Sequence, residues 1–405
     1  MTEVNAKSPH HSPRMQQLLQ PATGRTPQGS WGNVPQDRRP NWTFLHLGMC
    51  VKSKDILSCS HKPKDSEEFV QITTLEVGTP PQSFHMLLSI SDAGPFLPSL
   101  RCNASCWPFR QYKSSLSSTY VANGTHLIVQ YERLDALAIA SADTLHFAGL
   151  ELPNLTFGEA REPFLRRTPE IGDRDWDGEL GLAPSEKVSN PFPYIGPRFS
   201  TAMENPFLSM ASRGLLDRNV FGLKLSRGED DPGEIMFGDA NHDLYEGELK
   251  VLHLLYDSSD WSSAYGRWNV PATSISVGDG TASLEGYAAT LDSDFPLITL
   301  PENIVMLLEN HFGLKRPNRW LPSSMDCSKR DESEDLIITL GGYDFVISAY
   351  EYTIEFDREE YGGHRCLSAF RPMPRSREKY IHLGSAFLRG FYSLFDLDER
   401  TVSCK

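Results

Sequence analysis

Two short apolar runs in this chain are each followed by a polar loop, and the two loops resemble each other. The runs are Met86-Leu87-Leu88 and Ala288-Ala289-Thr290-Leu291. Aligned without gaps, the second loop has Asp292 at the position where the first has Ser89. A short apolar run bounded by polar residues is typical of a buried strand. The repeat therefore predicts two similar halves, each of which brings a buried strand to a polar loop.

Length and composition agree with a division into two parts. The chain has 405 residues, more than one ordinary core accommodates, and 39% of them are hydrophobic. The formal net charge is −14, with no long basic tract, so nucleic acid is not an expected partner.

Most of the chain has the pattern of short strands. From residue 69 onward, β-type runs such as 70–72, 126–129 and 144–147 alternate with Gly, Pro, Asn and Asp. Two segments have helical periodicity, residues 206–214 and 302–312. A mostly β chain is predicted.

The first 66 residues differ from the rest. They are rich in Pro, Gln, Ser and basic residues, apart from an apolar island at 42–49, and we expect a disordered leader or a pro-segment. Residues 1–25 lack the apolar core of a signal peptide, so either the true start differs or the protein follows another export route. No run of about 18 apolar residues predicts a membrane span, and residues 401–405 lack a lipid-anchor tail.

Several motifs resemble those of pepsin-like aspartic proteases of the A1 type, over residues 67–405. Beyond the two loops, the matching segments occur in the family's order, at 177–183, 220–225, 233–238, 382–388 and 395–396. The resemblance implies a mostly β, bilobal pepsin-like aspartic protease fold with a cleft between two β-barrel-like lobes. The expected division is a leader at 1–66, an N-terminal lobe at 67–229 and a C-terminal lobe at 230–405.

The family's activity depends on two aspartates that share one proton and activate a water molecule. Here Asp292 matches one of them, and Ser89 stands at the degenerate position of the other. A serine hydroxyl cannot act as the base. Asp92 is the alternative acid, because Asp92-Ala93-Gly94 matches the motif if a gap is allowed.

Other positions also depart from the family's pattern. Ser293 keeps the hydroxyl that bonds across to the opposite loop, whereas Ile90 does not. Ser91 and Asp294 replace the following glycines, and Asp294 is expected to add a charge beside Asp292. Tyr131 matches the tyrosine of the substrate-binding flap, but residues 132–134 replace its Gly-Thr-Gly tip.

Cysteines and glycosylation motifs favour a secreted glycoprotein. The resemblance implies disulfides Cys102–Cys106 and Cys327–Cys366, and it leaves the pairing of Cys50, Cys59 and Cys404 open. Asn-x-Ser/Thr motifs occur at Asn41, Asn103, Asn123 and Asn154. The expected location is the secretory pathway or the extracellular space.

Alternative motifs are weak. Gly278-Asp279-Gly280 faintly resembles a dinucleotide-binding loop, but a hairpin turn explains it better. Neither a metal site nor a cofactor is expected. The sequence thus favours a monomeric, catalytically impaired protease homologue, a pseudoenzyme that binds a peptide or protein in its cleft. The alternative is an active aspartic endopeptidase that uses Asp92 and Asp292.

Overall fold

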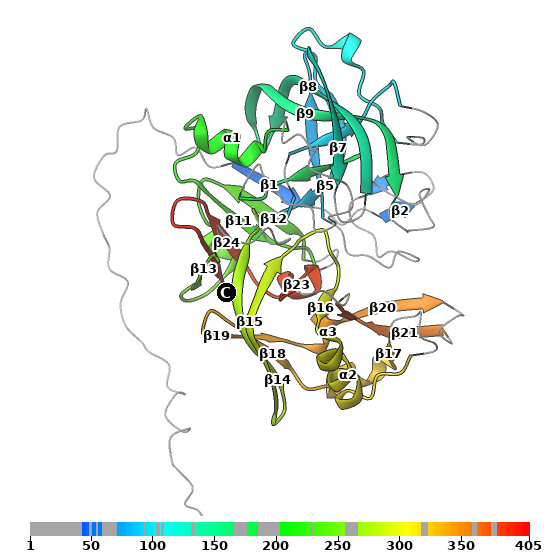
Figure 1. Cartoon of the computed structure of the whole chain (residues 1–405), viewed down its shortest axis with the longest axis vertical. Coiled ribbons are helices and arrows are strands. Elements are labelled where there is room, and N and C mark those ends of the chain that lie inside the picture. Colours follow the sequence, from blue (N-terminus) through cyan, green and yellow to red (C-terminus); the bar gives the residue numbers. More distant parts are fainter. Residues whose placement is uncertain are drawn as a thin grey trace, which may run out of the picture. The chain divides into compact units, whose positions relative to one another are not determined.

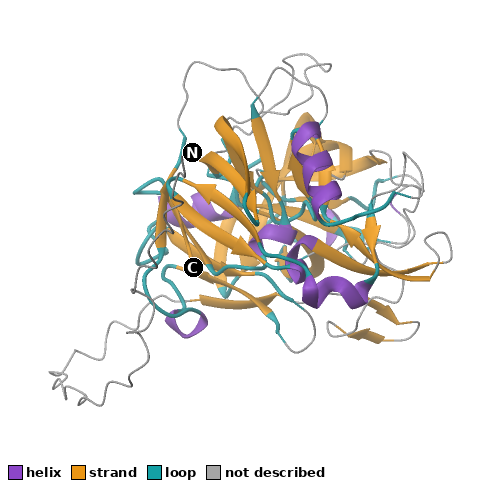
Figure 2. Ribbon diagram, turned by 90° about the horizontal axis from the view of Figure 1, so that it is seen from below, coloured by secondary structure: helices purple, strands orange, loops and turns teal. Residues whose placement is uncertain are grey.

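Short strands account for most of the structure, as predicted (Figure 1, Figure 2). The computed structural model describes residues 43–47, 51–53, 56–58, 71–92, 94–102, 106, 109–130, 134–165, 176–184, 203–227, 231–255, 266–316, 323–358, 363–373 and 379–405. All of them belong to one compact unit, residues 41–405.

A seven-stranded sheet contains the first of the two repeated loops. Its order is β4-β5-β10-β6-β9-β8-β7, and β4 also pairs with β8, which closes the sheet on itself. The strands are β4 (Ile72–Val77), β5 (Gln82–Ser89), β6 (Phe96–Pro98), β7 (Val121–Gln130), β8 (Leu134–Phe147), β9 (Leu150–Leu165) and β10 (Gly178–Gly181).

A second seven-stranded sheet contains the other loop, in the order β19-β18-β14-β15-β23-β16-β22. Its strands are β14 (Asn269–Val277), β15 (Gly280–Leu291), β16 (Ile298–Leu300), β18 (Leu336–Leu340), β19 (Tyr343–Ile347), β22 (Phe370–Pro372) and β23 (Tyr380–Leu383). Val277 pairs with Gly280, and Gly278 has φ 52°, so the Gly278-Asp279-Gly280 segment is a hairpin turn.

A six-stranded sheet joins strands from distant parts of the chain, in the order β1-β12-β11-β24-β25-β13. Figure 1 shows β11, β12 and β24 side by side. The strands are β1 (Thr43–Leu47), β11 (Val220–Lys224), β12 (Gly233–Phe237), β13 (Lys250–His253), β24 (Ser393–Asp396) and β25 (Thr401–Cys404). The three sheets form the mostly β, bilobal pepsin-like fold that the resemblance implied.

Part of the predicted leader is ordered into strands. β1 lies inside the apolar island at 42–49 and pairs antiparallel with β12, and a separate hairpin joins β2 (Val51–Ser53) to β3 (Ile56–Ser58). The prediction was a disordered leader or a pro-segment, and the apolar island supplies an edge strand to the six-stranded sheet. The limits of the leader and of the two lobes stay a prediction.

Helices are few and short (Figure 2). The two predicted helices are α1 (Pro206–Ser212) and α2 (Glu302–His311). Asn205 caps α1 by accepting from the amides of Phe207 and Leu208. Sequence periodicity did not reveal α3 (Ala349–Tyr352) and α4 (Ser385–Leu388), which have about one turn each. No helix in the described part of the chain is long and apolar enough to cross a membrane.

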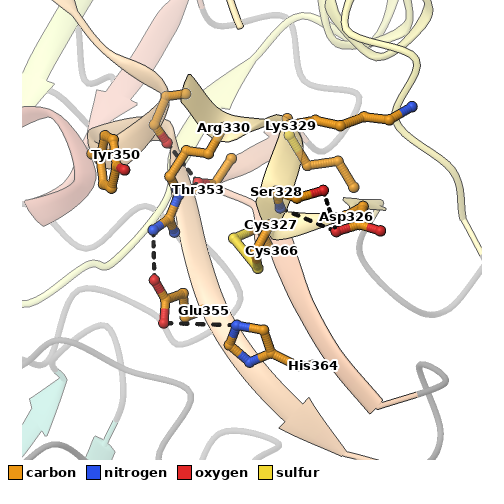
Figure 3. Close-up of a disulfide and its surroundings, with 12 residues drawn as sticks. Asp326, Cys327, Ser328, Lys329, Arg330, Tyr350, Thr353, Glu355, His364 and Cys366 are labelled. Atoms are coloured by element: carbon orange, nitrogen blue, oxygen red, sulfur yellow. Dashed lines mark hydrogen bonds and ion pairs between the residues drawn. A yellow bond between two sulfur atoms is a disulfide. The ribbon is translucent and has the colours of Figure 1, made fainter. Parts of the chain in front are cut away.

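Both implied disulfides are present. The Cα atoms are 6.0 Å apart in Cys102–Cys106 and 5.0 Å apart in Cys327–Cys366, within the reach of the bridge. Figure 3 shows Cys327 at the start of the 3-10 helix Cys327–Glu332, bonded to Cys366 of β21 (Gly363–Ser368). β21 pairs with β17 (Ser324–Met325) and β20 (Thr353–Arg358). Cys404 is a free, buried thiol.

An aromatic cluster lies in the core. The ring of Phe221 stacks on Phe395 with centroids 4.6 Å apart, and both rings contact Trp268. All three side chains are fully buried, and each such burial contributes about 2 kcal/mol or more to stability. Trp268 Nε1 also donates to the carbonyl of Leu182, which holds the segment before β14 against the segment after β10.

Candidate active site

The two loops have the same structural setting. Ser89 ends β5, which pairs parallel with β10, and Leu291 ends β15, which pairs parallel with β23. Residues 86–89 and 289–294 are all buried. The predicted repeat is thus a repeat in structure, in which a buried strand leads into a polar loop beside a parallel strand.

Glycine is required beside the second loop. A Cβ atom on Gly384 would lie 2.1 Å from the carbonyl oxygen of Phe295 and 2.4 Å from that of Leu297. These distances are far below van der Waals contact, so only glycine allows this approach. The residue that follows β23 therefore packs directly against the backbone of the loop after Asp292.

The hydroxyl of Ser293 joins the two loops, as the resemblance implied. It donates to the carbonyl of Leu88 at 2.9 Å and accepts from the amide of Ile90 at 3.1 Å. Ile90 has no hydroxyl, so its side chain cannot form the corresponding hydrogen bond to the second loop.

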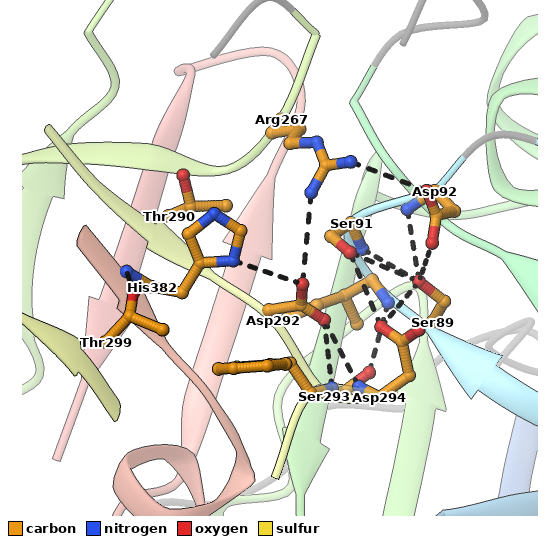
Figure 4. Close-up of polar contacts among 12 residues, drawn as sticks. Ser89, Ser91, Asp92, Arg267, Thr290, Asp292, Ser293, Asp294, Thr299 and His382 are labelled. Carbon is orange, nitrogen blue, oxygen red and sulfur yellow. Dashed lines mark hydrogen bonds and ion pairs between the residues drawn. The ribbon is translucent and has the colours of Figure 1, made fainter. Parts of the chain in front are cut away.

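Ser89 lies against a carboxyl group of each loop (Figure 4). Its Oγ is 3.1 Å from Asp92 Oδ2 and 3.0 Å from Asp294 Oδ1. Ser91 Oγ is 3.4 Å from the same Asp294 oxygen. The hydrogen bond of Ser89 to the second loop is therefore made to Asp294, two residues beyond Asp292.

A buried arginine lies between Asp92 and Asp292. Arg267 Nη2 is 3.7 Å from Asp92 Oδ1, and its Nη1 is 3.9 Å from Asp292 Oδ2 (Figure 4). The three side chains have exposed fractions of 5%, 4% and 0%, so water screens these charges little. The guanidinium thus faces both acids that the sequence proposed for catalysis.

His382 of β23 completes the surroundings of Asp292. Its Nδ1 is 3.9 Å from Asp292 Oδ2. Burial lowers the pKa of His382 to about 4, although the charge of Asp292 opposes this shift. The imidazole is therefore neutral at neutral pH.

The two acids of the second loop are shifted in opposite directions. Burial alone would raise the pKa of Asp292, but a hydrogen bond from Asp294 and the charge of Arg267 outweigh it, and the pKa is lowered. Burial and the negative charge of Asp292 raise the pKa of Asp294 well above its usual range. Burial beside Asp292 thus disfavours the extra charge that was expected at Asp294.

Sequence reasoning missed Arg267 and His382. Each is a titratable residue next to apolar residues of a strand, which could have marked it as a candidate site residue. The segments are Arg267-Trp268-Asn269-Val270 and Ile381-His382-Leu383. Neither residue belongs to a sequence motif that also contains Asp292. Only the fold brings them together.

The remaining predicted residues are distributed elsewhere. Asn123 on β7 and Asn154 on β9 are exposed. Tyr131, Asn41, Asn103, Cys50 and Cys59 lie outside the described residues. No cluster of three or more metal-binding side chains occurs among the residues that the structure describes.

Comparison with known proteins identifies the family. The model of the eukaryotic aspartyl protease family matches residues 71–404, which include both loops. The chain belongs to this family. It is 33% identical to vacuolar protease A of Aspergillus fumigatus, over 81% of this chain and 76% of that protein.

More distant relatives span similar lengths. Cathepsin E of Aquarana catesbeiana is 28% identical, with 84% of this chain and 79% of that protein covered. Cathepsin D of Dictyostelium discoideum is 27% identical, with 91% and 89% covered. The aspartyl protease similarity therefore extends over both seven-stranded sheets.

Proposed function

We propose that this chain is a catalytically impaired aspartyl protease homologue that binds a peptide or protein in the cleft between its lobes. The observation that carries the proposal is the buried guanidinium of Arg267 between Asp92 and Asp292. A serine occupies the position that the partner acid holds in active members.

The reaction requires a proton shared between two carboxyl groups on opposite loops. Here a permanent positive charge faces Asp292, which favours its ionised form and opposes the exchange of a proton with Asp92. Ser89 carries a hydroxyl that neither accepts a proton as a base nor ionises in acid. Loss of one member of an acid–base pair costs about 10²–10⁴ in rate.

The family supports a proposal for the ligand and for the cellular location of the protein. The relatives are named as vacuolar proteases and cathepsins. We propose a location in the secretory pathway, in an acidic vacuole or outside the cell, which the two disulfides support. Glycosylation is proposed at Asn123 and Asn154, whose side chains are exposed. The ligand is a peptide segment, and the protein acts as a monomer.

One observation favours the alternative of an active endopeptidase. Asp92 is buried, with 3% of its surface exposed, and it faces the same guanidinium as Asp292. If Arg267 moved away, the two acids would lie on opposite sides of the space that it leaves. In that case Asp92 would be the second catalytic acid.

A peptidase assay distinguishes the two functions. The wild-type protein, Asp292→Ala and Asp92→Ala are incubated with a denatured protein substrate between pH 2 and 7. We expect no turnover above that of Asp292→Ala. Turnover that both substitutions abolish would instead establish the active enzyme with Asp92 as its second acid.

A further inference from the structure

The side chain of Asp292 fixes the turn of its own loop. Its Oδ1 accepts from the amides of Asp294 and Phe295, two and three residues further on, both at 3.3 Å. Short polar side chains commonly stabilise turns by such local hydrogen bonds to the backbone. The other oxygen, Oδ2, lies 3.9 Å from Arg267 Nη1. One oxygen of Asp292 thus fixes the turn, and the other faces the junction where the two loops meet at Arg267.

The first loop forms the same turn with a different side chain. Ser89 Oγ accepts from the amides of Ser91 and Asp92, again two and three residues further on, at 3.3 and 3.1 Å. The spacing and the distances match those of the second loop, so Ser89 Oγ takes the place of Asp292 Oδ1. A serine side chain has only one oxygen. Ser89 therefore fixes the turn but has no second oxygen that could face Arg267.

Asp92 supplies the oxygen that Ser89 lacks. Its Oδ1 is 3.7 Å from Arg267 Nη2, close to the 3.9 Å that separates Asp292 Oδ2 from Nη1 of the same guanidinium (Figure 4). The other oxygen of Asp92, Oδ2, accepts from Ser89 Oγ at 3.1 Å. Ser89 Oγ thus contacts Asp92 twice, at its amide and at its carboxylate. The same hydroxyl is 3.0 Å from Asp294 Oδ1, so a carboxyl group of each loop contacts it.

We infer that Ser89 and Asp92 together replace the aspartate that is missing from the first loop, with Ser89 as the positioning residue of Asp92. Ser89 Oγ fixes the turn, and its two contacts hold the carboxylate of Asp92 toward Arg267. The backbone adds a further restraint, since the carbonyl of Asp92 accepts from the amide of Ala183 at 2.9 Å. Ser89 is fully buried and Asp92 is 3% exposed, so little water competes for these hydrogen bonds.

The junction therefore keeps one carboxyl group from each loop, although the first motif has lost its acid. The inference goes beyond the proposed function and holds whether or not the protein cleaves peptides.

Double-mutant cycles test the role of Ser89. Asp92→Asn and Arg267→Leu, alone and together, give the coupling between residues 92 and 267 from unfolding equilibrium constants in urea. We expect Asp92→Asn to raise this constant at least about tenfold more in the presence of Arg267 than in the Arg267→Leu background. In Ser89→Ala the same ratio should fall below about threefold, because the carboxylate is no longer held toward the guanidinium. Lower stability of Ser89→Ala with an unchanged ratio would overturn the inference.

The coupling of Asp292 with Arg267 is the matched control. It is measured with Asp292→Asn in the same way, and it should not fall in Ser89→Ala, because Asp292 is held by the amides of its own turn. A fall as large as that for Asp92 would mean that Ser89 supports the whole junction rather than Asp92, and would count against the inference.

Two further variants test the inference if Ser89→Ala does not fold. Ser89→Thr retains the hydroxyl and should keep the coupling of Asp92 with Arg267. Ser89→Asp provides both oxygens at one position, so its own carboxylate should face the guanidinium and the coupling of Asp92 should fall. Loss of the coupling in Ser89→Thr, or undiminished coupling of Asp92 in Ser89→Asp, would contradict the inference.

Discussion

Arg267 changes the chemistry of the site more than any other single residue. A buried guanidinium compensates buried carboxylates, and removal of one partner leaves an uncompensated charge. Its two carboxylate neighbours come from different loops, Asp92 from the first and Asp292 from the second. The arginine therefore also stabilises the junction between the loops.

Arg267→Leu should lower the free energy of unfolding at pH 7 by about 3 kcal/mol, because Asp92 and Asp292 would lose their positive neighbour. The loss should be smaller at pH 3, where protonation relieves the unpaired charges. Urea denaturation at both pH values measures it. Arg218→Leu is the control, since 54% of this side chain is exposed beside Asp239, and it should cost less than about 1 kcal/mol. An equal loss in both variants would contradict the assignment.

His382 should make the protein less stable in acid. The pKa of its imidazole falls from 6.5 to about 4 on burial, so between these values the unfolded chain binds a proton that the folded chain does not. Stability is therefore lost as pH falls from 6.5 to 4, by up to about 3 kcal/mol. His382→Leu should remove this loss, whatever its constant packing cost. Thermal unfolding between pH 3.5 and 7.5 tests it, with the exposed His364→Leu as the control. Parallel pH profiles of wild type and His382→Leu would refute it.

Strands and helices could be predicted from the sequence wherever a local residue pattern determines them. The apolar runs at 86–88 and 288–291 predicted the ends of β5 and β15, and helical periodicity predicted α1 and α2. The helices α3 and α4 are too short to show periodicity. β1 was not predicted as a strand, because its partner β12 lies far along the chain.

The same limit applies to the site. Asp292, Ser293 and the degenerate Ser89 could be predicted, because a contiguous motif carries them. Arg267 and His382 could not, since their distances from Asp292 are set by the pairing of β14, β15 and β23. The raised pKa of Asp294 depends on burial, which the residue type alone does not reveal.

Gly384→Ala tests the close approach of the residue after β23 to the second loop. The added Cβ would lie 2.1 Å from Phe295 O, so the backbone must shift, and we expect a loss of about 3 kcal/mol or more in the free energy of unfolding. Gly280→Ala is the control, because its Cβ would meet only Val277 O at 3.4 Å. Chemical denaturation of both variants provides the comparison. A loss no larger than that of the control would mean that the loop tolerates the displacement.

In the aspartyl protease family, catalysis depends on groups from both halves of the chain. Ser89 ends a strand of one seven-stranded sheet, whereas Asp292 follows a strand of the other. Arg267 lies just before β14 and contacts both acids. In the impaired homologue proposed above, activity depends on the junction, and no single replacement should restore it.

Stepwise restoration of the junction tests this dependence. Ser89→Asp alone should remain almost inactive, since Asp294 still occupies the glycine position and a misplaced catalytic group costs about 10²-fold. We expect at least about 10²-fold higher kcat/KM when Ile90→Thr, Ser91→Gly and Asp294→Gly are added. Arg267→Leu should then give a further gain of about tenfold, because Asp292 can share a proton only without the adjacent guanidinium. Cleavage of a denatured protein substrate between pH 2 and 7 measures each step, and Asp292→Ala in every background is the control. If Ser89→Asp alone matched the fully restored variant, the roles assigned to Asp294 and Arg267 would be wrong.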